Sequence, residues 1–403
     1  MRLEFELQCR PAKATFAIRM TSQNDNRRDY NRSHDVPTKI ATSRLAALLC
    51  IFFLIACGLG YPILNRYDPR QTPGLSDVRT YAALVTGTTI VDSEDMRFRR
   101  FRMLVPWIAK PFYALARRRV ASWDPVMFGL LVADSLFVAA TAVLIVVIGR
   151  RMLNSSAAGL VGALLYMVNF AVPNLRLVGL VDAGEGFFLL ALLWSLSEFR
   201  LWILPVIAVL GALTKESFIP FSIVLTSAWW LSTRTDRRSG SRIASDATWI
   251  LASWILGVAA MIGLYWSISG NYVSPLQFGS TLQRGGEEHF VLPLRDRNLW
   301  YIFLWLVPTA IPNLKRFPKS WLVPVAATCV VAFFLDAYFG GTPAAGSAWG
   351  RALFSIAGPL LSLSSASTLL RISGEHPMGR HYTLPEGPIA TTFSFAGADP
   401  PRA

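Results

Sequence analysis

Apolar residues are grouped along the chain in long blocks, and polar residues gather in the short stretches between them. A helix that crosses a bilayer needs about 20 predominantly apolar residues. By hydropathy the chain contains ten candidate blocks, two of them short. They cover residues 45–64, 126–148, 155–173, 180–197, 201–216, 218–232, 247–268, 299–313, 320–339 and 350–370. The pattern predicts an all-α protein, a polytopic bundle of about ten transmembrane helices.

The two short blocks meet at a pair of charges, Lys215 and Glu216. Each block carries a proline, Pro205 or Pro220, that is expected to kink its helix. Ionisable residues at membrane depth are costly and usually functional, so the pair marks a candidate site. The alternative is a short hairpin whose turn carries two solvated charges. Position alone leaves both interpretations open.

The basic residues of the short loops predict the orientation of the bundle. Residues 1–44 contain nine Lys/Arg and five acidic residues, which places the N-terminus in the cytoplasm. If the spans then alternate, both termini are cytoplasmic and every inner loop is basic. These loops lie near Arg150, Arg200, Arg237, Lys315 and Arg371. We therefore expect an integral multi-pass protein of the cell (inner) membrane, with a membrane domain at 45–371 and disordered cytoplasmic tails at 1–44 and 372–403.

Composition agrees with this picture, since 53% of the residues are hydrophobic and only 16% are charged. The net charge of +14 comes largely from loops, which indicates contact with anionic membrane lipids and not with nucleic acid. The four cysteines include no Cys-x-x-Cys pair, so neither a zinc site nor a disulfide framework is indicated.

The first predicted outer loop, residues 65–125, is an exception to the charge rule. It carries eleven Lys/Arg against six acidic residues, although long loops can be translocated despite their charge. A lipid phosphate would explain the excess, because the arginine fork matches phosphate oxygens. For Arg117–Arg119 the favoured explanation is simpler: they reach lipid headgroups from an interfacial helix. The amphipathic segment Trp107–Leu115 is too short to span and is expected to lie in the interface.

Candidate chemistry gathers on the same predicted face. Asp77 and Tyr81 are four residues apart and share one side of a short helix, although Asp77 can also be explained as its N-cap. Lys215 is expected to face a cavity with Asp77 and to reach an external anion. Glu216 should instead bond a neighbouring helix or an arginine such as Arg102 or Arg176. Other polar residues placed on this face are Asn174, Asp182, Glu185, Arg284, Glu287, Glu288 and His289.

Four features carry a resemblance to a known family. They are Asp77 with Tyr81, the segment Arg102–Pro106, the motif Ala212-Leu-Thr-Lys215-Glu216, and Gly350-Arg351-Ala-Leu-Phe354. In order and predicted sidedness they resemble the GT-C superfamily of integral-membrane glycosyltransferases, which use polyprenyl-phosphate-linked sugars. The resemblance implies an inverting transfer to an acceptor at the extracytoplasmic face. It further implies that Asp77 is the general base and that Lys215 and Arg102 hold the lipid phosphate. The remaining candidates for substrate binding are Tyr81, Asp182, Glu216 and Arg351.

Several alternatives stay open at this point. No cofactor is required, but some members of this superfamily use a divalent metal, and Asp77 with Glu287 or Glu288 offers suitable oxygen ligands. A transporter or flippase for a lipid-linked or anionic substrate is a second class of function, although the internal repeats common in transporters are not recognisable here. A non-catalytic membrane scaffold is a third. The sugar, the acceptor and the oligomeric state are not specified by the sequence.

Overall fold

The computed structural model describes residues 42–65, 77–88, 99–119, 122–233, 240–269, 291, 294–339 and 349–374. The chain divides into two compact units, residues 1–46 and 47–403. Of the first unit only residues 42–46 are described, and they begin helix α2. Within the described ranges the structure is helical and contains no strand, as the hydropathy pattern predicts.

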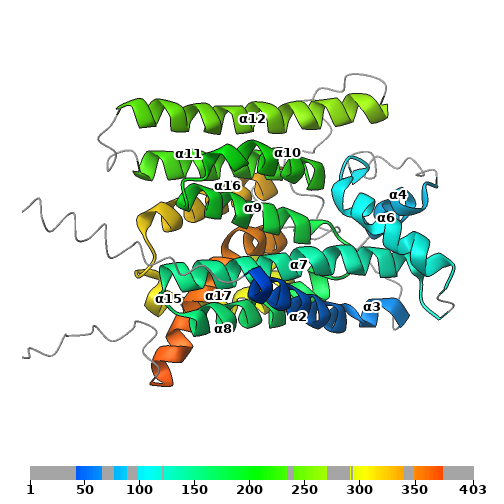
Figure 1. Cartoon of the computed structure of the whole chain (residues 1–403), viewed down its shortest axis with the longest axis horizontal. Coiled ribbons are helices and arrows are strands. Elements are labelled where there is room, and N and C mark those ends of the chain that lie inside the picture. The colour runs from blue at the N-terminus through cyan, green and yellow to red at the C-terminus, as the bar shows by residue number, and fades with distance from the viewer. Residues whose placement is uncertain are drawn as a thin grey trace, which may run out of the picture. The chain divides into compact units, whose positions relative to one another are not determined.

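Each predicted apolar block forms one or two helices (Figure 1). The helices of these blocks are α2 (Thr42–Gly60), α3 (Pro62–Asn65), α7 (Pro125–Met152), α8 (Ser156–Val168), α9 (Asp182–Ser197), α10 (Leu204–Thr214), α11 (Phe218–Thr233), α12 (Gly240–Ser269), α14 (Arg297–Phe303), α15 (Leu306–Leu314), α16 (Lys319–Phe339) and α17 (Trp349–Ile372). The segment expected as the first outer loop contributes α4 (Asp77–Thr86) and α6 (Leu104–Arg117).

Five of the described helical stretches are long and apolar enough to cross a membrane. They are Thr42–Gly60, Pro125–Met152, Ser245–Ile268, Lys319–Ala337 and Trp349–Ile372. Three further apolar helices are shorter, at Ser156–Val168, Leu201–Thr214 and Phe218–Thr233. The helices indicate a membrane protein. A complete set of ten spans, and the interfacial position of α4 and α6, stay predictions.

Pro205 and Pro220 do not kink long helices, contrary to the prediction. Pro205 lies at the beginning of α10, directly after a short 3₁₀ turn at Leu201–Ile203, and Pro220 is the third residue of α11. The first backbone N–H groups of a helix have no partner within it, so proline loses nothing there. Both prolines therefore help to begin separate short helices, and this leaves the turn with Lys215 and Glu216 between them.

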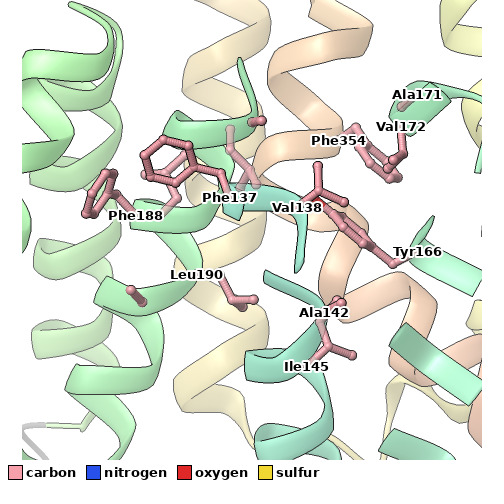
Figure 2. Close-up of a cluster of buried hydrophobic side chains, with 14 of the residues drawn as sticks. Phe137, Val138, Ala142, Ile145, Tyr166, Ala171, Val172, Phe188, Leu190 and Phe354 are labelled. Atoms are coloured by element: carbon pink, nitrogen blue, oxygen red, sulfur yellow. The ribbon is translucent and has the colours of Figure 1, made fainter. Parts of the chain in front are cut away.

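Helix α9 is the central element of the second unit. It contacts α7, α10, α11 and α17, and nearly all of its residues are buried. A helix that is apolar on all sides is expected in such a position. Aromatic contacts fix its neighbours: the Phe137 ring lies 5.8 Å from that of Phe188 on α9, and Tyr166 stacks on Phe354 at 5.3 Å (Figure 2). The first turn of α9 is thereby held firmly in the core.

The segment before α7 is packed against the same core. Helix α6 lies along α7 and α4 contacts α6. A Cβ added to Gly129 of α7 would lie 2.7 Å from the Ala109 carbonyl oxygen, so this glycine permits the close approach of α6. Asp124 caps α7 by accepting from the Val126 N–H at 2.8 Å. These contacts position the polar residues that precede α6.

Candidate functional site

Polar and ionisable side chains from five separate segments meet at the first turn of α9. They form two groups. The Arg102 cluster contains Asp77, Tyr81, Arg99, Arg102 and Glu216. The Lys215 cluster contains Asp182, Glu185, Lys215, Ser217 and Arg351. Lys215 and Glu216 are consecutive, so one peptide bond joins the two clusters.

In the Arg102 cluster a single guanidinium contacts three side chains. Its Nε donates to Glu216 Oε2 at 2.8 Å and its Nη2 donates to Glu216 Oε1, which makes a two-pronged pair. Its Nη1 donates to Tyr81 Oη at 2.8 Å and lies 3.4 Å from Asp77 Oδ2. Arg99 Nη2 is 3.2 Å from the other Asp77 oxygen. Arg102 therefore connects α4 with the turn between α10 and α11.

The local backbone explains this arrangement. Asp77 begins α4 and Tyr81 follows one turn later, so both side chains share the buried face of the helix, as predicted. A turn closed by the Arg102 N–H and the Arg99 carbonyl at 3.2 Å brings both arginines toward that face.

The surroundings of the Arg102 cluster keep the Tyr81 phenol protonated and the Glu216 carboxyl ionised. Burial raises the pKa of the Tyr81 phenol well above its usual value, although the positive charge of Arg102 opposes the shift. Tyr81 is therefore protonated, and because its oxygen accepts from Arg102, its O–H can donate to a bound molecule. Burial alone would raise the pKa of Glu216, but Arg102 outweighs it and lowers the pKa, so this carboxylate is ionised.

In the Lys215 cluster one ammonium joins two carboxylates. Lys215 Nζ donates to Asp182 Oδ1 at 2.7 Å and to Glu185 Oε2 at 3.0 Å. The second oxygens are also bonded: Ser217 Oγ donates to Glu185 Oε1, and Arg351 Nη1 lies 3.3 Å from Asp182 Oδ2. The backbone at Lys215 is extended (φ −162°, ψ 139°), and it ends α10.

Glycine in the first turn of α9 makes the close packing around this cluster possible. A Cβ added to Gly184 would lie 2.9 Å from Thr214 Cγ2 and 3.3 Å from Val105 Cγ2. Helices α10 and α6 therefore approach α9 at the position between its two acidic residues.

All seven residues singled out in the sequence lie in the two clusters: Asp77, Tyr81, Arg102, Asp182, Lys215, Glu216 and Arg351. Their chemical roles stay predictions. The expected bond between Glu216 and an arginine is confirmed, and the partner is Arg102 and not Arg176.

The prediction for Lys215 is wrong in one respect. Its ammonium is held by Asp182 and Glu185 instead of being free for an external anion, because a buried ammonium needs a partner and two carboxylates project from the first turn of α9. The solvated-hairpin alternative is wrong for Lys215, whose side chain is only 12% exposed, whereas the Glu216 side chain is 36% exposed but is paired with Arg102. Arg102 lies between Asp77 and the Lys215–Glu216 turn and contacts both Asp77 and Glu216, and the cavity expected there stays a prediction.

Sequence reasoning missed Asp134, a fully buried acid within α7. Neither of its carboxyl oxygens accepts a hydrogen bond of ordinary geometry, and the Gly179 backbone, Arg176 and Asp182 lie within electrostatic range. The available signal was the acid itself, placed inside the apolar block 126–148. A carboxylate without a partner is unfavourable in such surroundings, so this residue calls for a role.

Arg176 is the second buried charge near the clusters. It ends a π-helical turn, Val172–Arg176, and donates to the Tyr166 hydroxyl and, at 2.9 Å, to Ser355 Oγ. Its guanidinium carbon lies 4.8 Å from the centre of the Phe354 ring. A Cβ added to Gly186 would lie 2.5 Å from Arg176 Nη1, so Gly186 makes room for the guanidinium. Hydroxyls and aromatic faces thus hold this cation.

The remaining polar residues expected on this face contribute less. Asn174 is exposed and donates to the Phe170 carbonyl. Arg284, Glu287, Glu288 and His289 lie outside the described residues, so the metal site suggested for Asp77 with Glu287 or Glu288 is not tested. Within the described ranges no group of three or more His, Cys, Asp or Glu side chains is placed to hold a metal.

The two clusters together are formally neutral. Four carboxylates (Asp77, Asp182, Glu185, Glu216) stand against four cations (Arg99, Arg102, Lys215, Arg351). An anionic ligand that enters here must therefore draw a cation away from a carboxylate. No family model matches this chain and no curated protein matches it, so its chemistry is argued from these contacts.

Proposed function

We propose that this protein is an inverting membrane glycosyltransferase that moves a sugar from a polyprenyl-phosphate donor to an acceptor at the extracytoplasmic face. One observation supports the proposal above the others. Seven residues that were selected from the sequence lie in one connected network, although they come from five separate segments. A structural role alone does not require a base, a phenol and several cations in one place.

In the proposed reaction the acceptor hydroxyl attacks the anomeric carbon of the sugar. Asp77 takes the hydroxyl proton as the new carbon–oxygen bond forms. The bond from the anomeric carbon to the phosphate oxygen breaks, and the lipid phosphate leaves with the electron pair. Arg99 and Arg102 already flank Asp77, and the Tyr81 O–H can donate to the same phosphate.

The contacts modify the part proposed for Lys215. It bonds two carboxylates closely, whereas Arg351 reaches Asp182 through a single longer contact of 3.3 Å. Arg351 is therefore the cation of the Lys215 cluster that we propose to move to the phosphate, in addition to Arg99 and Arg102 of the other cluster. Lys215 keeps Asp182 and Glu185 in place while they do so.

The test is donor turnover by the purified full chain in lipid nanodiscs. A panel of polyprenyl-phosphate sugars is supplied with acceptors, and released lipid phosphate is measured. Asp77→Asn should retain donor binding and lose turnover by about a hundredfold or more, the usual range for a general base. Asp124→Asn is the matched control, because asparagine also caps a helix and α7 is preserved. Equal turnover in Asp77→Asn and wild type would contradict the proposal and favour a scaffold.

Asp134 favours a second candidate, a proton-coupled transporter or flippase. Buried carboxyls in membrane helices often carry protons, and this one is fully buried and makes no hydrogen bond of ordinary geometry. Proteoliposomes with an imposed pH gradient distinguish the two functions. A transporter would move lipid-linked or anionic substrate in response to the gradient and lose this response in Asp134→Asn. A transferase would turn over donor without one.

We further propose the topology that the basic loops predict, with ten spans, both termini cytoplasmic and the two clusters at the extracytoplasmic side of the cell membrane. Cysteine-accessibility labelling near Arg237 and near Arg99 tests it. Labelling from outside at position 237 would overturn the orientation.

A further inference from the structure

A separate pocket of about 200 Å³ lies between the ends of α7, α9 and α11 and the beginning of α16. Its walls include Arg151, Trp194, Glu198, Phe199, Trp229 and Trp321. Glu185 of the Lys215 cluster and Ser197 at the pocket are 12 residues apart on α9, which corresponds to about 18 Å along the helix. The pocket is thus distinct from the proposed catalytic site.

Aromatic rings dominate the walls of this pocket. Trp229 and Trp321 are almost completely buried and form fixed surfaces, while Phe199 is exposed at the rim. Phe199 has φ of +54°, a left-handed conformation that bulky residues rarely adopt. The guanidinium carbon of Arg200 lies 5.5 Å from the Trp194 ring centre, so one of these indoles already accepts a cation on its face.

The ion pair in the wall is asymmetric. Arg151 Nη1 bonds Glu198 Oε2, but the Glu198 side chain is 8% exposed whereas that of Arg151 is 66% exposed. The carboxylate is therefore a fixed part of the wall, and the arginine is a solvated arm. Arg151 is well hydrated whether or not it is paired, but Glu198 is nearly buried and needs another cation when Arg151 leaves.

We propose that this pocket, the Glu198 pocket, binds a small organic ammonium group, with Glu198 as its counter-ion and the accessible rings of Trp194 and Phe199 as its cation-binding faces. When the pocket is empty, Arg151 pairs with Glu198 in the place of the ligand's ammonium group, so it competes with the ligand for this carboxylate. The same chemistry is found in a choline-type lipid headgroup and in a soluble amine. The proposal is independent of the glycosyltransferase reaction.

The test titrates the full chain, purified in a non-ionic detergent, with tetramethylammonium by isothermal calorimetry at constant ionic strength. Glu198→Gln should weaken binding by about tenfold, because it removes the counter-ion and keeps the shape. Arg151→Gln should tighten binding several-fold, because it removes the competitor. Arg150→Gln, the neighbouring arginine, should leave the affinity unchanged.

Choline chloride and a short-chain phosphatidylcholine then distinguish the two sources: tighter binding of the phospholipid identifies a lipid headgroup site. The absence of tetramethylammonium binding to both wild type and Arg151→Gln would overturn the proposal. Equal affinity in wild type and Arg151→Gln would do the same. So would binding of inorganic phosphate that is lost in Arg151→Gln, since the pocket would then be an anion site.

Discussion

The two ends of α9 use charge in different ways. At its first turn, Asp182 and Glu185 are buried and each makes two contacts, so every charge there belongs to a connected network. At its other end, Glu198 has one cationic partner, and that partner is mostly in solvent. The first arrangement fixes the positions of α4, α9, α17 and the α10–α11 turn relative to each other. The second leaves a carboxylate beside an open pocket, where a ligand can replace the partner. An ion pair holds the helices together where both partners are buried. Where one partner is in solvent, as at Glu198, the carboxylate can bind a different cation.

The largest expected effect comes from Lys215→Met. It leaves two buried carboxylates together without their ammonium, and the loss of one partner of a buried pair costs about 3 to 5 kcal/mol. Arg151→Met at the other end should cost less than Lys215→Met, because it leaves one carboxylate without its cation instead of two and Arg151 itself is mostly in solvent. Thermal or denaturant unfolding in detergent micelles measures both. Similar losses for the two variants would remove the distinction between the ends.

A second substitution sharpens this comparison. Glu185→Gln in the Lys215→Met background removes one of the two stranded charges, so the double variant should recover about 1 to 3 kcal/mol relative to Lys215→Met, a coupling typical of residues in one network. The double-mutant cycle measures it directly. Additive losses would mean that the cluster is not an energetic unit.

Gly184→Ala should destabilise the protein by about 1 to 3 kcal/mol, because the new methyl group would press on Thr214 at the contact between α9 and α10. Gly263→Ala on α12 is the matched control: nothing lies within 4 Å of its added Cβ, and alanine favours a helix there. The melting temperature should fall for the first variant and stay constant or rise for the second. The reverse order would show that α9 and α10 do not approach as described.

The smallest effect concerns acid. The pKa of Glu216 is lower in the folded protein than its usual value of 4.5, so its pairing with Arg102 stabilises the fold above that pH. The contribution is lost as the pH falls through the lowered folded pKa. Wild-type stability should therefore decline below about pH 4.5 more steeply than that of Glu216→Gln. If the stability of wild type and of Glu216→Gln falls in parallel below pH 4.5, the pairing of Glu216 with Arg102 does not contribute to acid stability.

The sequence predicted the helices well, because hydropathy is a local property and each apolar block became helical. The seven residues that the sequence placed on one face do lie in two joined clusters, while their chemical roles and the side of the membrane stay predictions. The partner of Lys215 could not be predicted. Asp182 and Glu185 lie about thirty residues away, and only the packing of α9 against α10, through Gly184, sets their rotation toward the turn. Asp134 was missed because a single acid does not disturb the hydropathy of a long block.

One peptide bond connects Lys215, which is bound to α9, with Glu216, which is bound to Arg102. Consecutive Cα atoms are about 3.8 Å apart and the peptide between them is planar, so the backbone of one residue cannot shift far without moving that of the other. A molecule that pulls Arg102 away from Glu216 would release the turn and, through it, the ammonium between Asp182 and Glu185. A ligand bound beside α4 would then alter the contact between Asp182 and Arg351 of α17, because Lys215 and Arg351 bond the same carboxylate. Ligand binding at one cluster would therefore change the contacts of the other, because the peptide bond between Lys215 and Glu216 connects them.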